Sequence, residues 1–492
     1  MPPVVICSIR QTDAASFRRA FSRVSSGCGL IEIRADDLRT EEVAEVVKAA
    51  GRPVIVTLRR RSEGGGFDGS EEDRSAGLRA ALEAGALFVD VEWGSPQQVL
   101  AEGEHATRVI LSYHGSKCSL AALTPILRSM ASSGAARLKI VPEAAKPADG
   151  AVVRDLLRQA EEDSVVLACF AMGRAGALTR LMAPVWGSWA TYGSLEAGSE
   201  TAPGQFTATE LLESYEVLQI GASTRIFALL GNAVSGSPSP AMHQAAYREA
   251  AIDARYVPLE LDVLEDCRPL LGAEGLLGVE AFAVTIPFKE VAAAACRLDD
   301  EVAAAAESVN TVLLRDGGWR GYNTDGPAVV DLVRRRLDPR GAEVAIVGAG
   351  GTARAAAVAL AAAGSRVTLF NRTPDRARAV ARRLGVHAAD LRRLPGHAWQ
   401  VLVQATPLGA AGERLLERDE LCGRMVLDAV YGGETPLVRD ARRKGLAVAD
   451  GLELLVAQAV PQFERMTGAR AREATMRQAG QRWLSGRAVN LP

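Results

Sequence analysis

Short apolar runs recur through the first ~220 residues of the chain, and segments with helical spacing of apolar positions separate them. The runs are rich in Val, Ile and Leu, which is typical of strands buried on both faces. Eight such runs occupy residues 4–9, 30–34, 54–59, 87–92, 109–114, 137–141, 165–170 and 189–192. The helical segments between them, such as 41–50, 74–84 and 120–132, are long enough to return the chain to a parallel neighbour. The pattern therefore predicts an α/β fold with an N-terminal (β/α)8 barrel.

Polar side chains stand at or near the ends of five successive runs in this part of the chain. They are Glu32, Arg34, Arg59, Glu92, His114 and Lys139. The carboxyl ends of barrel strands share one face, and such folds place their reactive groups there. Any one of these residues alone would fit an ordinary loop entry. Their repetition on successive strands predicts one site.

A second architecture begins after residues 211–224, which we expect to form a closing helix and a short joint. Runs at 226–231, 256–261 and 281–286 predict strands, and a helix follows from about Val291. A βαβ pattern then extends from 344 to about 448, followed by predicted helices at 452–466 and 472–484. We expect a barrel at 1–222, a first α/β lobe at 225–338 with 452–492 packing back on it, and a second α/β lobe at 340–451.

The composition indicates small-molecule chemistry. The chain has 492 residues, 48% of them hydrophobic, and its 57 Lys and Arg nearly balance 59 Asp and Glu. The formal charge of −2 gives no field that would attract nucleic acid or an anionic membrane. No segment approaches the ~18 uninterrupted apolar residues that span a bilayer, and the N-terminus lacks a signal-like pattern. We expect neither secretion nor membrane insertion.

The cysteines and histidines exclude two further kinds of site. Seven cysteines are scattered without a CxxC pair, and five histidines show no HExxH spacing. This distribution argues against a disulfide framework and against a metal site built by the protein. We therefore expect a cytoplasmic protein without a bound metal.

Lys139 lies in the run RLKIV, with apolar neighbours on both sides. An ammonium is costly to desolvate, so an apolar pocket favours the free amine, which can attack a ketone and form a protonated imine. His114 on the neighbouring run could remove a proton beside that imine, and Glu63 could orient the imidazole. The alternative is a structural ion pair between Lys139 and Glu32 or Glu92.

Several motifs across this half occur in the order found in type I 3-dehydroquinate dehydratase. They are EIR at 32–34, TLR at 57–59, EGG at 63–65, SYH at 112–114, LKI at 138–140, MGRAGALTR at 172–180 and APGQ at 202–205. The half resembles that family. The resemblance implies a Schiff base between Lys139 and 3-dehydroquinate, proton transfer by His114, and pairing of Glu63 with His114.

The same resemblance implies which residues contact the substrate. Arg180 and Gln205 would hold the carboxylate, since guanidinium groups match carboxylates. The full set of implied contacts is Glu32, Arg34, Arg59, Arg180, Thr201 and Gln205. Thr201 departs from the family, which usually has serine before APGQ, but it keeps a hydroxyl.

The segment GAGGTA after the predicted strand at 344–347 fits the G-x-G-x-x-A turn that binds a dinucleotide pyrophosphate. At the end of the next predicted strand, 366–370, the chain has Asn371, Arg372 and Thr373 where an NAD site commonly has an acidic residue. Arginine and hydroxyl groups there favour NADP(H). The predicted cofactor-binding residues are Gly348, Ala349, Gly350, Gly351, Thr352, Ala353, Asn371, Arg372, Thr373 and Arg376.

Residues 225–490 resemble shikimate dehydrogenase. The motifs are GNAVSGSPSPAMH from 231, VTIPFK from 284, VNT from 309, NTDG from 323, DAVY at 428–431 and VAQA at 456–459. The resemblance implies carboxylate binding by Ser237 and Ser239 and a catalytic pair of Lys289 and Asp325. The other implied substrate contacts are Thr285, Asn310, Tyr431 and Gln458. Three departures are Gly236 for histidine, Ala283 for asparagine and Gln404 for the asparagine of NAT.

A lysine beside a carboxylate can donate a proton to the alkoxide that forms as hydride reaches a ketone. An ordinary ion pair in a capping loop is the alternative for Lys289 and Asp325. The order of the halves resembles the fused enzymes of the shikimate pathway. It implies conversion of 3-dehydroquinate to 3-dehydroshikimate and then, with NADPH, to shikimate. Other possibilities are an NAD-dependent quinate/shikimate dehydrogenase fusion and a catalytically dead metabolite-sensing regulator.

Overall fold

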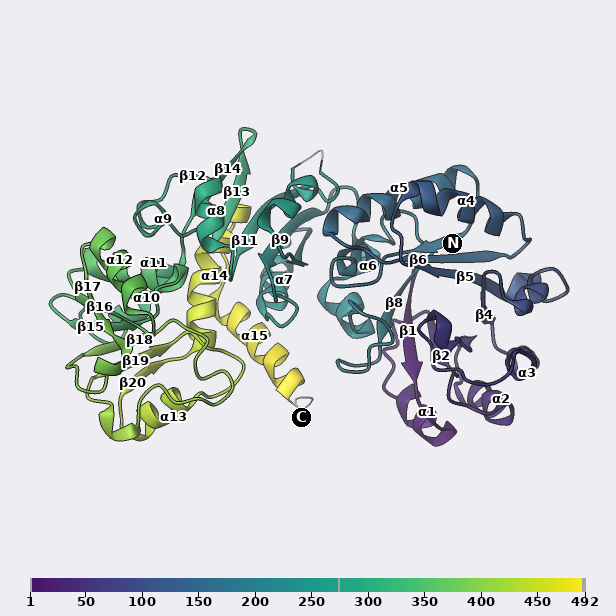
Figure 1. Ribbon diagram of the computed structural model, residues 1–492, viewed down its shortest axis with the longest axis horizontal. Helices are drawn as coiled ribbons and strands as arrows, with labels where there is room; N and C mark the ends of the chain where they lie inside the picture. Colours follow the sequence, from purple (N-terminus) through teal and green to yellow (C-terminus); the bar gives the residue numbers. More distant parts are fainter. Residues whose placement is uncertain (1, 273–274, 489–492) are drawn as a thin grey trace. The chain divides into compact units, whose positions relative to one another are not determined.

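The computed structural model describes residues 2–272 and 275–488 of the chain, coloured along the sequence in Figure 1. These residues form two compact units. The first ends at Thr224 and the second starts at Arg225, with the short segment Glu265–Leu270 grouped with the first unit.

The first unit is a barrel of eight parallel strands in the order β7-β6-β5-β4-β3-β2-β1-β8. The strands are β1 (Val4–Arg10), β2 (Leu30–Arg34), β3 (Val54–Thr57), β4 (Phe88–Glu92), β5 (Val109–Gly115), β6 (Arg137–Pro142), β7 (Leu167–Cys169) and β8 (Ala190–Ser194). All eight predicted runs coincide with strands. The two end strands approach closely, because the Trp189 amide donates to the Leu167 carbonyl at 3.2 Å. The predicted (β/α)8 fold is confirmed.

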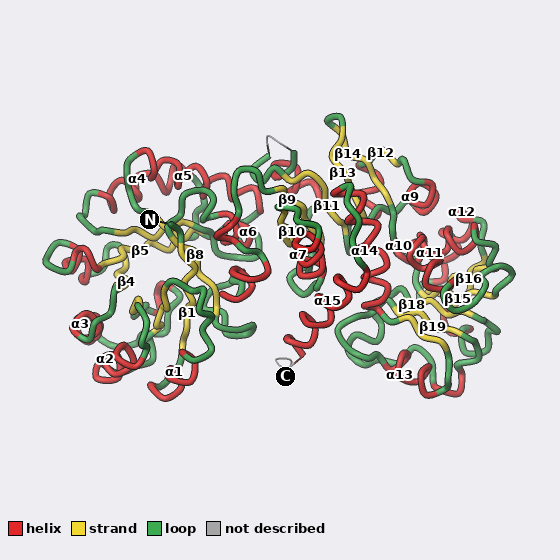
Figure 2. Tube along the Cα trace, turned by 180° about the vertical axis from the view of Figure 1, so that it is seen from behind, coloured by secondary structure: helices red, strands yellow, loops and turns green. Residues whose placement is uncertain are grey.

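Helices connect the barrel strands and surround them, as the red segments around the yellow strands show in Figure 2. They are α1 (Ala14–Phe21), α2 (Thr40–Ala49), α3 (Glu71–Glu83), α4 (Leu120–Ala131), α5 (Gly150–Glu162) and α6 (Ala177–Met182). The sequence predicts a closing helix and a short joint over 211–224, but no helix of the predicted length forms. Only the short helical turns Glu210–Ser214 and Val217–Gln219 form there. Glu216 between them has a left-handed backbone (φ 47°), which interrupts a helix.

The second unit starts with a mixed sheet in the order β10-β9-β11-β13-β14-β12. Its strands are β9 (Arg225–Gly231), β10 (Ala254–Glu260), β11 (Val279–Val284), β12 (Arg297–Leu298), β13 (Thr311–Arg315) and β14 (Gly318–Tyr322). The sequence reading missed the antiparallel hairpin β13–β14. Its turn, Asp316–Gly317, has positive φ at both residues (52° and 73°), which is the conformation that an Asp-Gly dipeptide favours in hairpins.

A second sheet in this unit is entirely parallel, in the order β17-β16-β15-β18-β19-β20. Its strands are β15 (Glu343–Val347), β16 (Arg366–Asn371), β17 (His387–Asp390), β18 (Val401–Gln404), β19 (Met425–Asp428) and β20 (Ala447–Ala449). The strand order reverses between β15 and β18, and ligands of such sheets bind beyond the carboxyl ends at that point.

Helices complete both lobes of the second unit. They are α7 (Ser239–Glu249), α8 (Lys289–Ala295), α9 (Glu301–Ala306), α10 (Asp325–Arg334), α11 (Gly351–Ala362), α12 (Pro374–Leu384), α13 (Pro436–Arg443), α14 (Gly451–Thr467) and α15 (Glu473–Ala488). Helices α14 and α15 return to the first lobe. Their residues Phe463 and Met476 share a buried core with Phe227 and Tyr247.

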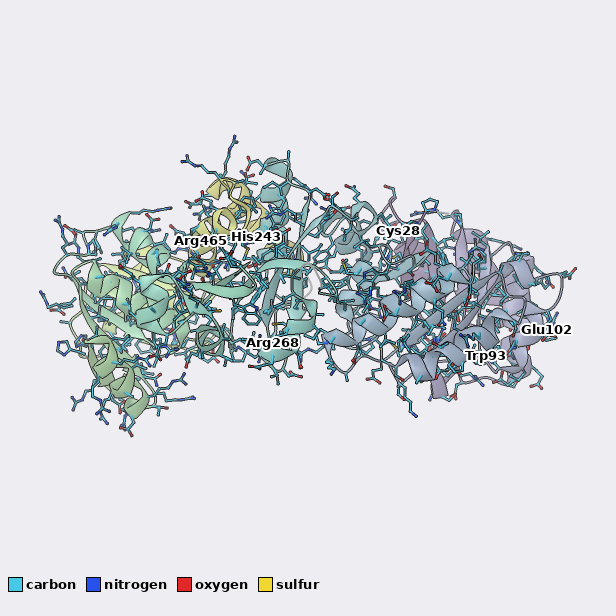
Figure 3. The ribbon with its side chains drawn as sticks, turned by 90° about the horizontal axis from the view of Figure 1, so that it is seen from above. Cys28, Trp93, Glu102, His243, Arg268 and Arg465 are labelled. Carbon is cyan, nitrogen blue, oxygen red and sulfur yellow. The ribbon has the colours of Figure 1, made fainter. Side chains whose placement is uncertain are left out.

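His243 of the SPAMH motif is a core residue of that first lobe. Its ring is fully buried and stacks on Tyr256 with 4.1 Å between the ring centroids. Figure 3 labels His243 among the side chains of the second unit. Burial lowers the pKa of the imidazole to about 3, so the ring is neutral and packs as an aromatic side chain. In the described part of the chain, no helix combines the length and apolar character needed to cross a bilayer.

Two candidate active sites

A cavity of about 350 Å³ opens at the carboxyl ends of the barrel strands. It gathers the residues that the sequence predicted for a site in the first unit, except Glu92. Its lining includes Glu32, Arg34, Arg59, Glu63, His114, Lys139, Arg180, Thr201 and Gln205. The residues come from strands far apart in sequence, and parallel strands bring their ends to one face.

Lys139 is 4% exposed, and carboxylates rather than apolar groups surround its ammonium. Its Nζ donates to Asp90 Oδ2 at 2.6 Å and lies 3.7 Å from Glu32 Oε1. The ring of Tyr192 lies 4.7 Å from the same nitrogen. The expected apolar pocket is therefore wrong. A buried ammonium requires such partners because an unpaired charge is costly to desolvate.

Asp90 is the main partner of Lys139, and the sequence reading missed it. The carboxylate also accepts from Arg59 Nη2 at 3.0 Å and from Ser112 Oγ at 2.6 Å. Burial alone would raise the pKa of Asp90, but Lys139 and Arg59 outweigh burial and hold this pKa below its ordinary value. Asp90 lies two positions before Glu92, which the sequence analysis names as a possible partner of Lys139. The two side chains therefore point to the same side of β4.

Glu92 is not a partner of Lys139, in contrast to one of the expected alternatives. It is 2% exposed and bonds to the guanidinium groups of Arg74 and Arg60. Arg74 is itself 1% exposed and also bonds to Glu71. This ion-pair cluster fixes the segment after β3, because the Arg60 amide also donates to Glu92.

His114 accepts a hydrogen bond at Nδ1 from Arg59 Nη1. A guanidinium only donates, so the neutral ring carries its hydrogen on Nε2. Burial lowers the pKa of His114 well below its ordinary value, and the cations Arg59 and Lys139 lower it further. The imidazole is therefore neutral near pH 7 and able to accept a proton.

The sequence predicts a hydrogen bond between Glu63 and His114, but the two side chains are not bonded in the structure. Glu63 accepts instead from Arg60 Nη2 at 2.9 Å, since Arg60 is anchored by its 3.1 Å bond to Glu92. Burial raises the pKa of Glu63, and the neighbouring Glu92 raises it further.

Arg180 is the strongest anion-binding group of this cavity. Its side chain is 1% exposed and lies over the ring of Phe170 at 4.7 Å, yet Nε and Nη2 have no hydrogen-bond partner. Burial lowers the pKa of Arg180 to about 10. Buried charges are normally paired, so the free nitrogens indicate a site for a carboxylate or another anion.

The remaining polar groups of the cavity are held by one another. Gln205 Oε1 accepts from the Thr201 amide at 2.9 Å, and Thr201 Oγ1 lies 3.0 Å from Ser8 Oγ. Arg34 Nη2 donates to Asp36 Oδ2 at 2.6 Å. The threonine hydroxyl that departs from the family pattern therefore occupies an ordered position.

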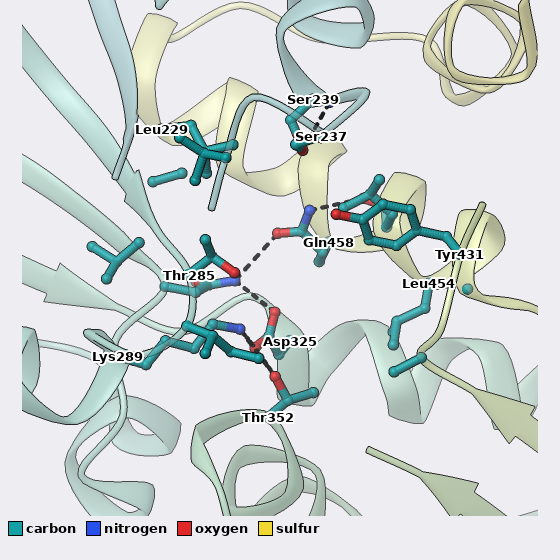
Figure 4. Close-up of a pocket in the computed structure, with 18 of the residues that line it drawn as sticks. Leu229, Ser237, Ser239, Thr285, Lys289, Asp325, Thr352, Tyr431, Leu454 and Gln458 are labelled. Carbon is teal, nitrogen blue, oxygen red and sulfur yellow. Dashed lines mark hydrogen bonds and ion pairs between the residues drawn. The ribbon is translucent and has the colours of Figure 1, made fainter. Parts of the chain in front are cut away.

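The second unit contains a cavity of about 430 Å³, part of which is shown in Figure 4. Its lining includes Ser237, Ser239, Thr285, Lys289, Asn310, Asp325, Tyr431 and Gln458. Every substrate contact predicted for this half is among them. Residues of both lobes line the cavity, because Thr352 and Thr406 follow strands of the parallel sheet.

Lys289 and Asp325 form an ion pair in this cavity, with Nζ 2.5 Å from Oδ2. Asn310 Nδ2 donates to the other carboxylate oxygen of Asp325 at 2.8 Å and to Gln458 Oε1 at 3.2 Å. Asp325 is the first residue of α10, where a carboxylate is favoured by the helix dipole. Near the opposite end of the cavity, Ser237 Oγ donates to Ser239 Oγ at 3.1 Å.

The turn predicted to bind a dinucleotide contains two glycines that the structure requires. Gly348 has φ 119°, which favours glycine. A Cβ on Gly351 would lie 2.6 Å from Ser308 Oγ and 3.0 Å from the Cβ of Lys289. Ala353, the third residue of α11, is fully buried. The side chain of Thr352 bonds to Lys289 and Asp325 within the protein.

The residues after β16 fit the phosphate of NADP(H). Asn371 Nδ2 donates to the Thr373 carbonyl at 3.0 Å and shapes this loop. Arg372 is exposed and bonds to no other described residue, whereas Arg376 lies 3.5 Å from Glu290. Arg372 is therefore the available guanidinium at the place where the adenine ribose binds in such folds.

The departures from the family motifs are compatible with the same architecture. Gln404 Nε2 donates to the Leu408 carbonyl at 2.7 Å, and its Oε1 accepts from the Thr406 amide at 3.1 Å. Gln404 thus holds the loop that lines the cavity. A Cβ at Gly236 would enter open space, and Ala283 is part of the core.

Family models match most of the chain. Type I 3-dehydroquinase matches residues 5–222, and the substrate-binding domain of shikimate dehydrogenase matches 229–312. Shikimate/quinate 5-dehydrogenase matches 331–418, and the C-terminal domain of shikimate 5′-dehydrogenase matches 451–479.

Curated relatives give the same picture. The chloroplastic bifunctional 3-dehydroquinate dehydratase/shikimate dehydrogenase of Arabidopsis thaliana is 32% identical over 476 residues, which cover 90% of this chain and 78% of the relative. The NADP(+) shikimate dehydrogenase of Halobacterium salinarum is 40% identical over 52% of this chain and 97% of its own. A crystal structure of a shikimate dehydrogenase with NADP+ is 28% identical, with a TM-score of 0.50 over 54% of this chain and 98% of that chain.

The unpaired guanidinium of Arg180 predicts an unusual effect on stability. Arg180→Met should leave the free energy of unfolding of the first unit unchanged or raise it by about 1–4 kcal/mol, because it removes a buried charge without a partner. Arg74→Met is the matched control. It should lower that free energy by about 3 kcal/mol, because Glu92 loses a buried partner.

Hydrogen exchange of the slowest amides in β1–β8 measures this free energy for the first unit alone. An equal loss of stability in the two variants would contradict an anion site at Arg180.

Proposed function

The chain belongs to the family of bifunctional 3-dehydroquinate dehydratase/shikimate dehydrogenases, and we propose how its parts divide that function. It combines a type I dehydroquinase, which is a lyase, with an NADP-dependent shikimate dehydrogenase, which is an oxidoreductase. Residues 1–222 dehydrate 3-dehydroquinate to 3-dehydroshikimate. Residues 225–338 with 452–492 bind this product, and residues 340–451 bind the NADPH that reduces it to shikimate.

One observation supports this division most strongly: each cavity holds a lysine bonded to an aspartate, beside groups that fit a carboxylate. In the barrel these groups are Lys139, Asp90 and the unpaired Arg180. In the second unit they are Lys289 and Asp325, with Ser237 and other hydroxyls nearby.

In the barrel, Lys139 is proposed to form a Schiff base. The amine attacks the ketone, a C–N bond forms, and water leaves as the protonated imine forms. His114 then accepts a proton from the carbon next to the imine carbon, and the electron pair moves toward the imine nitrogen. The C–O bond of the departing hydroxyl breaks as His114 returns the proton, and water hydrolyses the imine.

The neighbours of Lys139 prepare these steps. Asp90 can take up the proton that the ammonium must lose before attack, because the two groups are 2.6 Å apart. Arg180 holds the substrate carboxylate, with Gln205 and Thr201 beside it. Arg59 now donates to Nδ1 of His114, so a substrate hydroxyl that binds Arg59 would free this nitrogen to act as the base.

Other residues frame the ring of the substrate in this site. Glu32 accepts from Ser8 and Thr57, and Arg34 is held by Asp36. We propose that Glu32 and Arg34 contact ring hydroxyls from these fixed positions. Glu63 would reach His114 once Arg60 releases it.

In the second unit, bound NADPH supplies a hydride to the ketone of 3-dehydroshikimate. Lys289 donates a proton to the oxygen that becomes the new hydroxyl, and Asp325 holds the ammonium and a substrate hydroxyl. Ser237, Ser239 and Tyr431 bind the carboxylate end of the substrate. Thr285, Asn310 and Gln458 contact the ring hydroxyls.

The turn from Gly348 to Ala353 would hold the cofactor, and its backbone amides would bind the pyrophosphate. Asn371, Arg372 and Thr373 would bind the 2′-phosphate, and Arg376 would add positive charge nearby. All seven cysteines are free thiols, which supports a reducing compartment such as the cytoplasm as the place of action.

The two lysines are expected to act independently. Lys139→Ala should reduce dehydration of 3-dehydroquinate to background while sparing shikimate oxidation by NADP+, because the covalent route is lost. Lys289→Ala should lower kcat of the oxidoreduction by about 100- to 10,000-fold with little change in KM, because a general acid is lost. Separate assays of enone absorbance and NADPH absorbance measure the two reactions. Loss of both activities in either variant would argue against this division.

Cofactor preference is expected to depend on Arg372. Arg372→Ala should lower kcat/KM for NADP about 10- to 100-fold and leave kcat/KM for NAD nearly unchanged, since a charge-assisted contact to the 2′-phosphate is lost. Arg376→Ala is the control and should have a smaller effect, because Arg376 is shared with Glu290. Steady-state rates of both variants with NADP and with NAD measure these effects. Equal losses with NAD and NADP would place Arg372 outside the phosphate site.

A further inference from the structure

Thr352 of the dinucleotide turn forms a closed ring of hydrogen bonds with Lys289 and Asp325. Its Oγ1 accepts from Lys289 Nζ at 3.0 Å and donates to Asp325 Oδ2 at 3.0 Å. Nζ in turn donates to the same Oδ2 at 2.5 Å. Figure 4 shows the three side chains pointing toward one another from separate elements.

The three residues stand at the first turns of three helices that belong to different parts of the unit. Lys289 begins α8 and Asp325 begins α10, and both belong to the first lobe. Thr352 is the second residue of α11 in the parallel-sheet lobe. The Thr352 hydroxyl therefore connects the cofactor-binding lobe to Lys289 and Asp325, the pair proposed to transfer the proton.

The backbone around Thr352 is shaped for this approach. A side chain on Gly351 would clash with Ser308 Oγ at 2.6 Å and would press on the Cβ of Lys289 at 3.0 Å. Glycine at 351 thus lets the turn lie against α8. The threonine hydroxyl then reaches the ammonium without a distorted side chain.

The Lys289 ammonium has few hydrogen-bond partners besides Asp325. Asn310 uses Oδ1 of Asp325, while Lys289 and Thr352 share Oδ2. Among the described residues, only Asp325 and Thr352 hydrogen-bond to Lys289 Nζ. The other charged residue at this start of α8, Glu290, is paired with Arg354 at 2.9 Å and Arg376 at 3.5 Å.

We propose that Thr352 is a positioning residue for proton transfer, which aims the Lys289 ammonium and ties its orientation to the cofactor turn. This inference rests on the proposed role of Lys289 as the proton donor. The hydroxyl fixes the rotation of Nζ, because a single carboxylate contact leaves the ammonium free to swing about its stem.

The test compares Thr352→Val, which keeps the shape and removes the hydroxyl, with Thr352→Ser, which keeps the hydroxyl. In the valine variant, kcat for reduction of 3-dehydroshikimate should fall about 10-fold, and KM for NADPH should change less than about threefold. The serine variant should restore the rate.

Two controls separate the possible failures. NADPH binding, followed by its fluorescence, shows that the valine variant keeps a folded turn, and Lys289→Ala reports on the donor itself. Wild-type kcat in Thr352→Val, with Lys289→Ala inactive, would overturn the role of Thr352 alone. A loss confined to KM for NADPH would do the same and make Thr352 a cofactor contact. Full activity in Lys289→Ala would overturn the proposed donor, and the role of Thr352 with it.

Discussion

A lysine ammonium held against an aspartate carboxylate is the interaction on which each half of this protein depends. Lys139 and Asp90 are 2.6 Å apart in the barrel, and Lys289 and Asp325 are 2.5 Å apart in the second unit. Neither charge would be stable alone in a cavity, so the surrounding strands and helix starts must bring the partners together. In the barrel, strands bring the two charged groups together, and in the second unit the N-termini of helices do so.

The surroundings of the two pairs differ, and the difference fits the two proposed roles, attack on carbon by Lys139 and proton donation by Lys289. Around Lys139 lie further cations and the neutral imidazole of His114, whose pKa is lowered by burial and by its positive neighbours. A neutral base beside an amine suits imine chemistry. Around Lys289 lie hydroxyl and amide groups: Thr352 accepts from the ammonium, and Asn310 donates to its partner Asp325. That arrangement suits delivery of a proton to an oxygen.

Much of the fold could be predicted from the sequence, because buried parallel strands appear as continuous apolar runs and dinucleotide-binding turns have glycines at fixed spacings. The strands of the barrel follow from these patterns, and most residues of both cavities follow from the family motifs. Side-chain pairing could not be predicted, since it depends on distances between strands. Asp90 was missed in favour of Glu92, and the bond of Glu63 to Arg60 was not expected. Thr352 was assigned to the cofactor, although its hydroxyl faces the other lobe.

The most direct test of the central claim is reduction by sodium borohydride in the presence of 3-dehydroquinate, followed by peptide mass spectrometry. Borohydride converts a protonated imine into a stable secondary amine, so it records which lysine bonds to carbon. The account predicts an adduct on Lys139 and none on Lys289, with loss of dehydration and retention of shikimate oxidation. An adduct on Lys289, or no adduct on Lys139 while dehydration proceeds, would contradict it.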